Sequence, residues 1–362
     1  MITAKYPMTD AYHHIYDGQI FQKSQCIWHE NVMLDWLRSH LIALGYVSAG
    51  GSNKVWRRDD RTVVACLVDD ISTCSDQNDP YVPRLWDPSV TVLTDNHVTC
   101  PTMYSVRQLP SSWFGIYAYD IGAATWQPDR RFNLSINRLD MKRMLLFLEY
   151  RKRLPWDPDR DAIDYVNFNC WAWDGDNSSR TGLNANFERQ WQLLDDYQKT
   201  AYQETFDQDH TKLPLRNHDL AHDDAMHRAW INLVVETYSG DSIVAVSEKI
   251  FRALVTPVPW MVYSGRYTVV YLESLGFDCL SDIVDHAYDA MIETRTVDYG
   301  DKTVDWFWQA NENYNRLRQQ DFETLLTRCQ QAAQHNQQLL ARLRRQWPQE
   351  LASWWWSVSQ DL

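Results

Sequence analysis

Long hydrophobic runs and paired cysteines are both missing from this sequence of 362 residues. No stretch approaches the about 18 consecutive apolar residues that a membrane-spanning helix needs, so we expect no membrane partner. Residues 1–18 contain no apolar core of a secretory signal, which predicts a cytoplasmic protein. The seven cysteines are scattered and form no CxxC pair, which favours reduced thiols over a disulfide framework or a structural zinc site.

Positive charge is also in short supply, since acidic residues outnumber lysine and arginine and the formal net charge is −13. Non-specific nucleic-acid binding depends on many lysine and arginine contacts to phosphate, so a large surface of that kind is excluded. Short basic segments at 130–131, 142–143 and 151–153 leave room for a local basic groove.

Tryptophan is abundant, with 18 residues beside 19 tyrosines. Large aromatic side chains serve as packing groups or as flat platforms for sugars and bases. Packing is the favoured interpretation, because tryptophan is highly buried on average.

Apolar runs alternate with amphipathic stretches along the chain, which predicts an α/β fold of two Rossmann-like domains facing a cleft and a long C-terminal helical tail. A polar stretch at 120–130 is the predicted linker, so we assign domains to 1–129, 130–303 and 304–362. Predicted strands include 61–70, 89–94, 132–137, 163–168, 231–237 and 259–265. Predicted helices include 27–45, ending at Gly45, then 138–153, 187–207, 247–256 and 304–346. The last has one apolar face, formed by Leu325, Cys329, Ala332, Leu339 and Leu343.

The segment 231–265 carries the strongest indication of a binding site. A predicted strand brings Glu236 to its carboxyl end, and Ser247 stands where the next helix begins. A helix N-terminus attracts phosphate, Lys249 adds a full positive charge, and Glu248 can accept hydrogen bonds from ribose hydroxyls. The alternative is an ordinary helix start, capped by Ser247 and followed by an acidic first turn.

These residues resemble the donor half of α1,3-fucosyltransferase-like GT-B enzymes. The likeness rests on Glu236, Ser247-Glu248-Lys249, Pro259 and Gly265, with Ser in place of Thr at 247 and no Asn after Glu236. The segment FNLSINRLDMKR resembles the start of that donor domain, with Asn137, Arg138 and Arg143 in its strand-to-helix turn. The resemblance implies that an arginine clamps the donor pyrophosphate in a bidentate manner.

A second set of motifs extends over roughly 90–290. It consists of Leu109–Tyr117, Asn137-Arg138-Leu139-Asp140, Arg143, Tyr271-Leu272, Leu275-Gly276-Phe277, Asp285 and Tyr288-Asp289. In these motifs the chain more closely resembles phage-encoded proteins described as glycosyltransferases. The resemblance implies a metal-independent enzyme that takes a UDP- or GDP-sugar, with hydroxymethylated bases of phage DNA as a candidate acceptor and the host cytoplasm as its location. A glycan or small-molecule acceptor and a non-catalytic nucleotide- or nucleic-acid-binding protein are the alternatives.

An inverting transferase needs a general base near the acceptor hydroxyl. Asp95 and His97 follow a predicted strand and are the first candidates, while His13, His14 and Asp17 are the second. A retaining enzyme needs no such base, and an aspartate after a strand is commonly a turn former. Aromatic candidates for stacking on the acceptor or base are Trp113, Tyr117 and Tyr263.

Two acidic or histidine-rich segments resemble metal sites. Asp174-Gly175-Asp176 spells the DxD of metal-dependent GT-A transferases, but it opens a Gly/Asn/Ser loop, so an acidic turn is favoured. His218 and His222 have the i, i+4 spacing of zinc ligands, but Asp219 stands where a zincin has its glutamate. For His218, His222, Asp223, Asp224 and His227 a solvated helix face is favoured, and no metal is expected.

Overall fold

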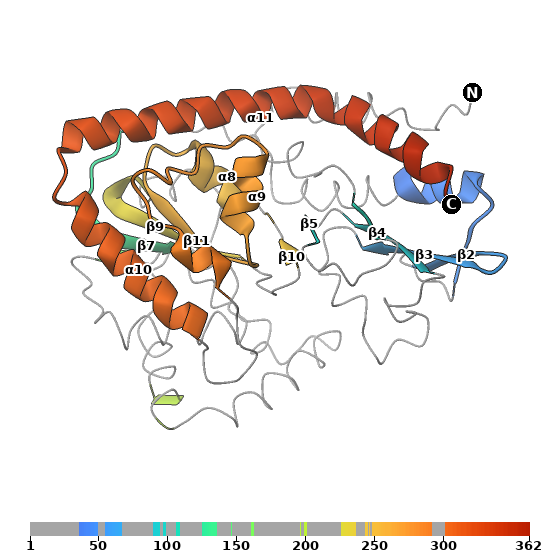
Figure 1. Ribbon diagram of the computed structural model, residues 1–362, viewed down its shortest axis with the longest axis horizontal. Coiled ribbons are helices and arrows are strands. Elements are labelled where there is room, and N and C mark those ends of the chain that lie inside the picture. Colours follow the sequence, from blue (N-terminus) through green and yellow to red (C-terminus); the bar gives the residue numbers. More distant parts are fainter. Residues whose placement is uncertain are drawn as a thin grey trace, which may run out of the picture. The chain divides into compact units, whose positions relative to one another are not determined.

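The protein is a mixed α/β structure (Figure 1). The computed structural model describes residues 36–49, 55–66, 90–94, 97–98, 106–108, 125–135, 146, 161–162, 196, 199–200, 226–236, 243–244, 246, 248–291 and 301–362. The strands are β1 (Val47–Ser48), β2 (Val55–Arg58), β3 (Arg61–Cys66), β4 (Val90–Thr94), β5 (His97–Val98), β6 (Val106–Gln108), β7 (Arg130–Ser135), β8 (Asp161–Ala162), β9 (Ala229–Val235), β10 (Ile243–Val244) and β11 (Trp260–Tyr263). The helices are α8 (Glu248–Val255), α9 (Thr268–Ser274), the 3-10 helix η4 (Ala287–Ala290), α10 (Asp301–Leu317) and α11 (Phe322–Ser359), with a further helical segment at 36–43.

The chain divides into two compact units. Unit 1 comprises Met1–Tyr119, Gly240–Glu248 and Gln337–Leu362, and unit 2 comprises Asp120–Ser239 and Lys249–Asn336. The domain boundaries expected at 129/130 and 303/304 stay a prediction. None of the helices in the described ranges has the length and apolar composition needed to cross a membrane.

Unit 1 contains a mixed sheet of strand order β1-β2-β3-β4-β6. The β2–β3 pair is an antiparallel hairpin, whereas β3, β4 and β6 run parallel. The predicted strands at 61–70 and 89–94 are confirmed as β3, which is described to Cys66, and β4. Their valine-rich runs are buried, as central strands of a sheet require. Gly45 ends the helical segment as expected, with a φ of 87° that favours glycine.

The C-terminal part of α11 helps to form the core of unit 1. Leu351, Val358 and Leu362 are buried there with side chains of the helical segment and the sheet. The main-chain oxygen of Leu362 accepts hydrogen bonds from Tyr46 Oη at 2.9 Å, from Arg61 at 2.6 Å and from Arg58. These contacts fasten the end of the chain to β2 and β3.

Unit 2 is built on a parallel sheet of order β11-β9-β7-β8. Its strands β7, β9 and β11 confirm the predicted runs at 132–137, 231–237 and 259–265, with shifts of up to two residues at their ends. Side chains alternate between the two faces of such a sheet. Phe132 and Tyr263 contact Tyr314 and Trp306 of α10 with ring centroids 5.7 and 5.3 Å apart, so α10 covers one face (Figure 1). The opposite face includes Asn232 and Glu236 and meets α8.

The C-terminal helical stretch is two helices, where the sequence predicted one over 304–346. The chain leaves α10 after Leu317 and starts α11 at Phe322. Asp321 caps α11, since its Oδ2 accepts from Thr324 N at 2.9 Å and from Thr324 Oγ1 at 2.7 Å. This N-cap pattern is the signal that marks the break. The apolar face predicted from Leu325 onward is buried as far as Leu339, and Leu343 is half-buried.

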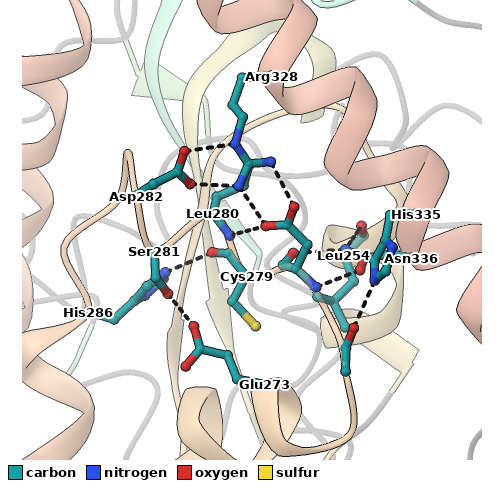
Figure 2. A network of polar contacts seen from close by, with 12 residues as sticks. Leu254, Glu273, Cys279, Leu280, Ser281, Asp282, His286, Arg328, His335 and Asn336 are labelled. Carbon is teal, nitrogen blue, oxygen red and sulfur yellow. Dashed lines mark hydrogen bonds and ion pairs between the residues drawn. The ribbon is translucent and has the colours of Figure 1, made fainter.

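Arg328 fastens α11 to the loop that follows α9 (Figure 2). Its guanidinium donates two hydrogen bonds to Asp278, both at 2.8 Å, and two to Asp282, at 2.6 and 2.8 Å. Partial burial by itself raises the pKa of Asp278, but the bonds from Arg328 and from Leu280 N outweigh it and hold that pKa below its ordinary value. This charge-assisted network positions the loop against the helix.

Asp289 caps the N-terminus of α9 from a distant part of the chain. Its Oδ2 accepts from Val269 N at 3.0 Å and from Val270 N at 3.3 Å, while Tyr267 at the cap position is left-handed and gives no side-chain cap. A carboxylate at this end satisfies exposed N–H groups and matches the helix dipole. The Tyr288-Asp289 pair noted in the sequence therefore has a structural role.

We expect Asp289→Ala to lower the free energy of unfolding by about 1–2 kcal/mol, because the N–H groups of Val269, which is buried, and Val270, which is part-buried, lose their acceptor. Asp289→Asn keeps an acceptor of the same shape, so its loss is expected to be about half as large. Urea denaturation of both variants measures the difference. Equal losses would show that the negative charge, rather than the cap geometry, carries the effect.

His286 joins η4 to the loop after α9 through both ring nitrogens. Its Nε2 lies 3.0 Å from the carbonyl oxygen of Cys279, which only accepts, so Nε2 carries the proton. Its Nδ1 lies 3.0 Å from Tyr288 Oη and accepts from it, while Tyr288 Oη accepts from Val262 N of the edge strand β11. Burial lowers the pKa of His286, and nearby Arg316 adds to this, against Glu273, Asp285 and the Cys279 hydrogen bond.

The lowered pKa of His286 predicts that acid destabilises unit 2. The unfolded chain binds the histidine proton near pH 6.5, before the folded chain does, so stability is present above that pH and is lost as pH falls through it. We expect the free energy of unfolding to drop by on the order of 1 kcal/mol between about pH 7.5 and about pH 5.5. His286→Gln should show a smaller drop in the same urea titrations. An identical pH profile in wild type and variant would contradict this role.

Candidate functional site

The parallel sheet of unit 2 has a topological switch point between β7 and β9. After β7 the chain adds β8 on one side, and it later adds β9 and β11 on the other. Connections that leave neighbouring strands in opposite directions open a crevice at their carboxyl ends, which is where open α/β sheets bind ligands. Glu236 directly follows the last residue of β9 and therefore stands at this edge.

Glu236 and Lys249 meet at the carboxyl edge. Lys249 Nζ lies 3.5 Å from Glu236 Oε2, and the two side chains are 13% and 2% exposed. Lys249 lies in the first turn of α8, and the main-chain N–H of Glu236 donates to Tyr263 O of β11 at 2.9 Å. Two residues that the sequence assigned to one site are thus brought together from two elements, as a buried ion pair. An ammonium group suits phosphate and a carboxylate suits hydroxyl groups, so the pair has the charges that a nucleotide-sugar site would use.

The other predicted donor residues are only partly described. Asn137 and Arg138 follow β7 in the sequence and, with Arg143 and Ser247, lie outside the described residues. Glu248 is the first residue of α8. These assignments stay predictions.

Of the two candidate general bases, Asp95 is outside the described residues and His97 begins β5 in unit 1. β5 pairs antiparallel with β10, so that His97 stands opposite Val244, a few residues before Glu248 in the sequence. The alternative candidates His13, His14 and Asp17 are outside the described part of the chain.

Tyr263 is wrong as a stacking platform. Its side chain is 1% exposed and lies against Trp306 in the core under α10. It follows the alternation of β11 onto the covered face, and Glu236 belongs to the opposite face. The other two aromatic candidates, Trp113 and Tyr117, are outside the described residues.

An amide pair inside the sheet was not predicted from the sequence. Asn133 Nδ2 donates to Asn232 Oδ1 at 3.0 Å, and both residues are fully buried opposite one another on β7 and β9. Asn232 Nδ2 continues to Met226 O at 3.3 Å. Both side chains lie on the Glu236 face of the sheet, where their polarity in otherwise apolar strands was the available signal.

The two segments that resemble metal sites lie almost entirely outside the described residues. Asp174-Gly175-Asp176, together with His218, His222, Asp223 and Asp224, lies outside the described residues. His227 is buried, at 3% exposure, before the start of β9. Within the described ranges no group of three or more metal-ligating side chains is placed to hold an ion.

Comparisons with protein-family models, with curated proteins and with solved structures found no match to this chain.

Proposed function

We propose that this protein is a nucleotide-sugar-dependent glycosyltransferase of GT-B type, with the donor bound by unit 2. The observation that carries the proposal is the buried Lys249–Glu236 pair at the carboxyl edge of a parallel sheet, beside its switch point. That edge is the general ligand position of such sheets, and the pair supplies opposite charges there. The resemblance over 90–290 supports the choice of a sugar nucleotide over other nucleotides.

In this proposal the bond between the anomeric carbon and the diphosphate breaks, and a bond from that carbon to an acceptor hydroxyl forms. Lys249, with Arg138 or Arg143, neutralises the leaving diphosphate, which is the charge that develops in the transition state. Glu236 and Glu248 bind hydroxyls of the ribose or sugar. The acceptor proton passes to Asp95 or His97 if the configuration is inverted.

A hydroxymethylated base of DNA is the proposed acceptor, supported by the resemblance to phage-encoded enzymes. A base inside a duplex has to leave the stack before its hydroxymethyl group can react, so a single-stranded or mismatched target should react faster than a paired one. A glycan or small-molecule acceptor is the alternative, and the acidic net charge of −13 favours it.

Donor binding is tested by calorimetric titration with UDP, GDP and their sugar conjugates. Lys249→Met is expected to weaken binding at least about tenfold, the loss of one charge-assisted contact to phosphate. Arg252→Met is the matched control, because it removes a positive charge from the last turn of the same helix. Unchanged affinity in Lys249→Met would overturn the placement of the donor.

Turnover is tested by following nucleotide release with hydroxymethylated DNA, with glycans and with water as acceptors. Release that depends on one acceptor class supports transfer and identifies the acceptor. Tight nucleotide binding with no release under any condition would instead identify a non-catalytic nucleotide-binding protein.

A further inference from the structure

Unit 2 has a second concave site at the opposite end of its sheet. An open depression of about 900 Å³ lies where β7 and β9 begin, in the size range of small-molecule sites. The segment before β7 extends the sheet there, since Gln127 N donates to His227 O at 2.9 Å and Asp129 N donates to Arg228 O at 3.0 Å. The depression is lined chiefly by Trp126, Gln127, Asp129, Arg228, Trp230 and Phe322.

The floor is aromatic and held in a fixed orientation. The ring of Trp230 meets those of Trp126, Tyr314 and Phe322 at interplanar angles of 79°, 78° and 74°, with centroids 5.7 to 6.4 Å apart. Trp126 is fully buried, and its Nε1 donates to Ala229 O at 2.7 Å. None of these three rings stacks parallel on Trp230, and Trp230 and Phe322 are half-buried within the depression. The indole of Trp230 is therefore a rigid, partly exposed surface.

The rim carries the carboxylate of Asp129, which pairs with Arg228 and also lies 3.6 Å, Oδ1 to Nε, from Arg130. Arg228 donates from Nε to both oxygens of Asp129 at 3.1 Å and from Nη2 to Oδ2. Their side chains are 41% and 51% exposed, so the pair is accessible from solvent. The hydrogen bonds from Arg228 hold the pKa of Asp129 below its ordinary value, which keeps it an acceptor.

We propose that this depression binds a neutral saccharide ring. A sugar has an apolar C–H face, which fits the rigid aromatic floor, and hydroxyls that both donate and accept, which fit an Asp129 acceptor beside an Arg228 donor. A nucleotide fits less well, because Arg228 and Arg130 are both paired with Asp129, whose carboxylate offsets part of the positive charge that phosphate binding needs. The seven residues of β9 span about 20 Å, so this site is separate from Glu236 and does not depend on the donor proposal.

The proposal is tested on the full chain by saturation-transfer NMR and calorimetry with methyl glycosides and short oligosaccharides. We expect millimolar binding that Trp230→Leu, Asp129→Asn and Arg228→Gln each weaken about tenfold, the factor that corresponds to 1.4 kcal/mol. Trp230→Phe keeps a flat ring and should retain affinity within about threefold. Arg318→Gln is the matched control, since Arg318 stacks on Tyr314 at 5.5 Å without lining the depression.

Lys249→Met separates this site from the donor site. It should leave saccharide affinity unchanged even where it removes nucleotide binding. Absence of saccharide binding at millimolar concentration, equal affinity in Trp230→Leu and Trp230→Phe, or displacement of the saccharide by uridine monophosphate would overturn the proposal.

Discussion

Replacing Lys249 by methionine is expected to lower the free energy of unfolding by about 3 kcal/mol. The change leaves Glu236, whose side chain is only 2% exposed, without the ammonium that lies 3.5 Å away. A buried charge that loses its counter-ion has a large desolvation penalty. Urea denaturation followed by circular dichroism measures the loss.

The companion change Glu236→Gln distinguishes ion-pair loss from loss of packing. In the double variant neither charge remains, so most of the stability should return, to within about 1 kcal/mol of wild type. Arg252→Met controls for the loss of a cation on α8 and should cost less than about 1 kcal/mol. If Lys249→Met alone stays within about 0.5 kcal/mol of wild type, the pair does not behave as a buried ion pair in solution.

The double variant also tests whether the ion pair contributes to nucleotide binding. A folded protein without either charge can be assayed for nucleotide binding, and a loss of affinity there cannot be attributed to unfolding. A purely structural pair would leave nucleotide affinity untouched in that variant. The comparison therefore separates the two roles that the same residues could have.

The strands of both units were predictable because buried parallel strands are short, continuous apolar runs. RTVVAC and INLVV have this character, and both form central strands. The start of α8 was predictable from its polar entry followed by an amphipathic turn. The pairing order of the strands was not, since it depends on contacts between segments about a hundred or more residues apart.

The features that could not be predicted from the sequence depend on strand register and on helix caps supplied by distant residues. A run in which every residue is buried, such as β11, does not show which side chains face which helix, so Tyr263 was assigned to a crevice. The cap of α9 by Asp289 joins residues 20 positions apart, beyond any local motif. The short break between α10 and α11 had a local signal in Asp321 and Thr324, which the strong helical composition on both sides obscured.

Only part of the candidate site could be predicted from the sequence. Residue types at the end of a strand and the start of the next helix indicated that Glu236 and Lys249 share an edge, because βαβ geometry returns both to the carboxyl side. Their ion pair and its burial depend on how deeply α8 packs on the sheet, which the residue pattern does not specify. The amino-end depression has no sequence motif, since its lining comes from three separated segments.

Trp306→Ala is expected to lower the free energy of unfolding by about 4 kcal/mol, the other large effect. Trp306 is fully buried on α10, where its ring contacts those of Tyr263, Phe307 and Tyr288 at centroid distances of 5.3, 5.0 and 6.5 Å. Truncation removes these ring contacts and leaves a cavity that close-packed neighbours fill only in part.

Trp308 supplies a matched control on the same helix, because its side chain is 65% exposed. Trp308→Ala should therefore change stability by no more than about 0.5 kcal/mol in the same urea denaturation series. The pair tests the interpretation that tryptophan in this chain serves mainly as a packing residue. Similar losses in the two variants would mean that exposed tryptophans such as Trp308 are covered in solution, and that the contacts of α10 extend beyond those described.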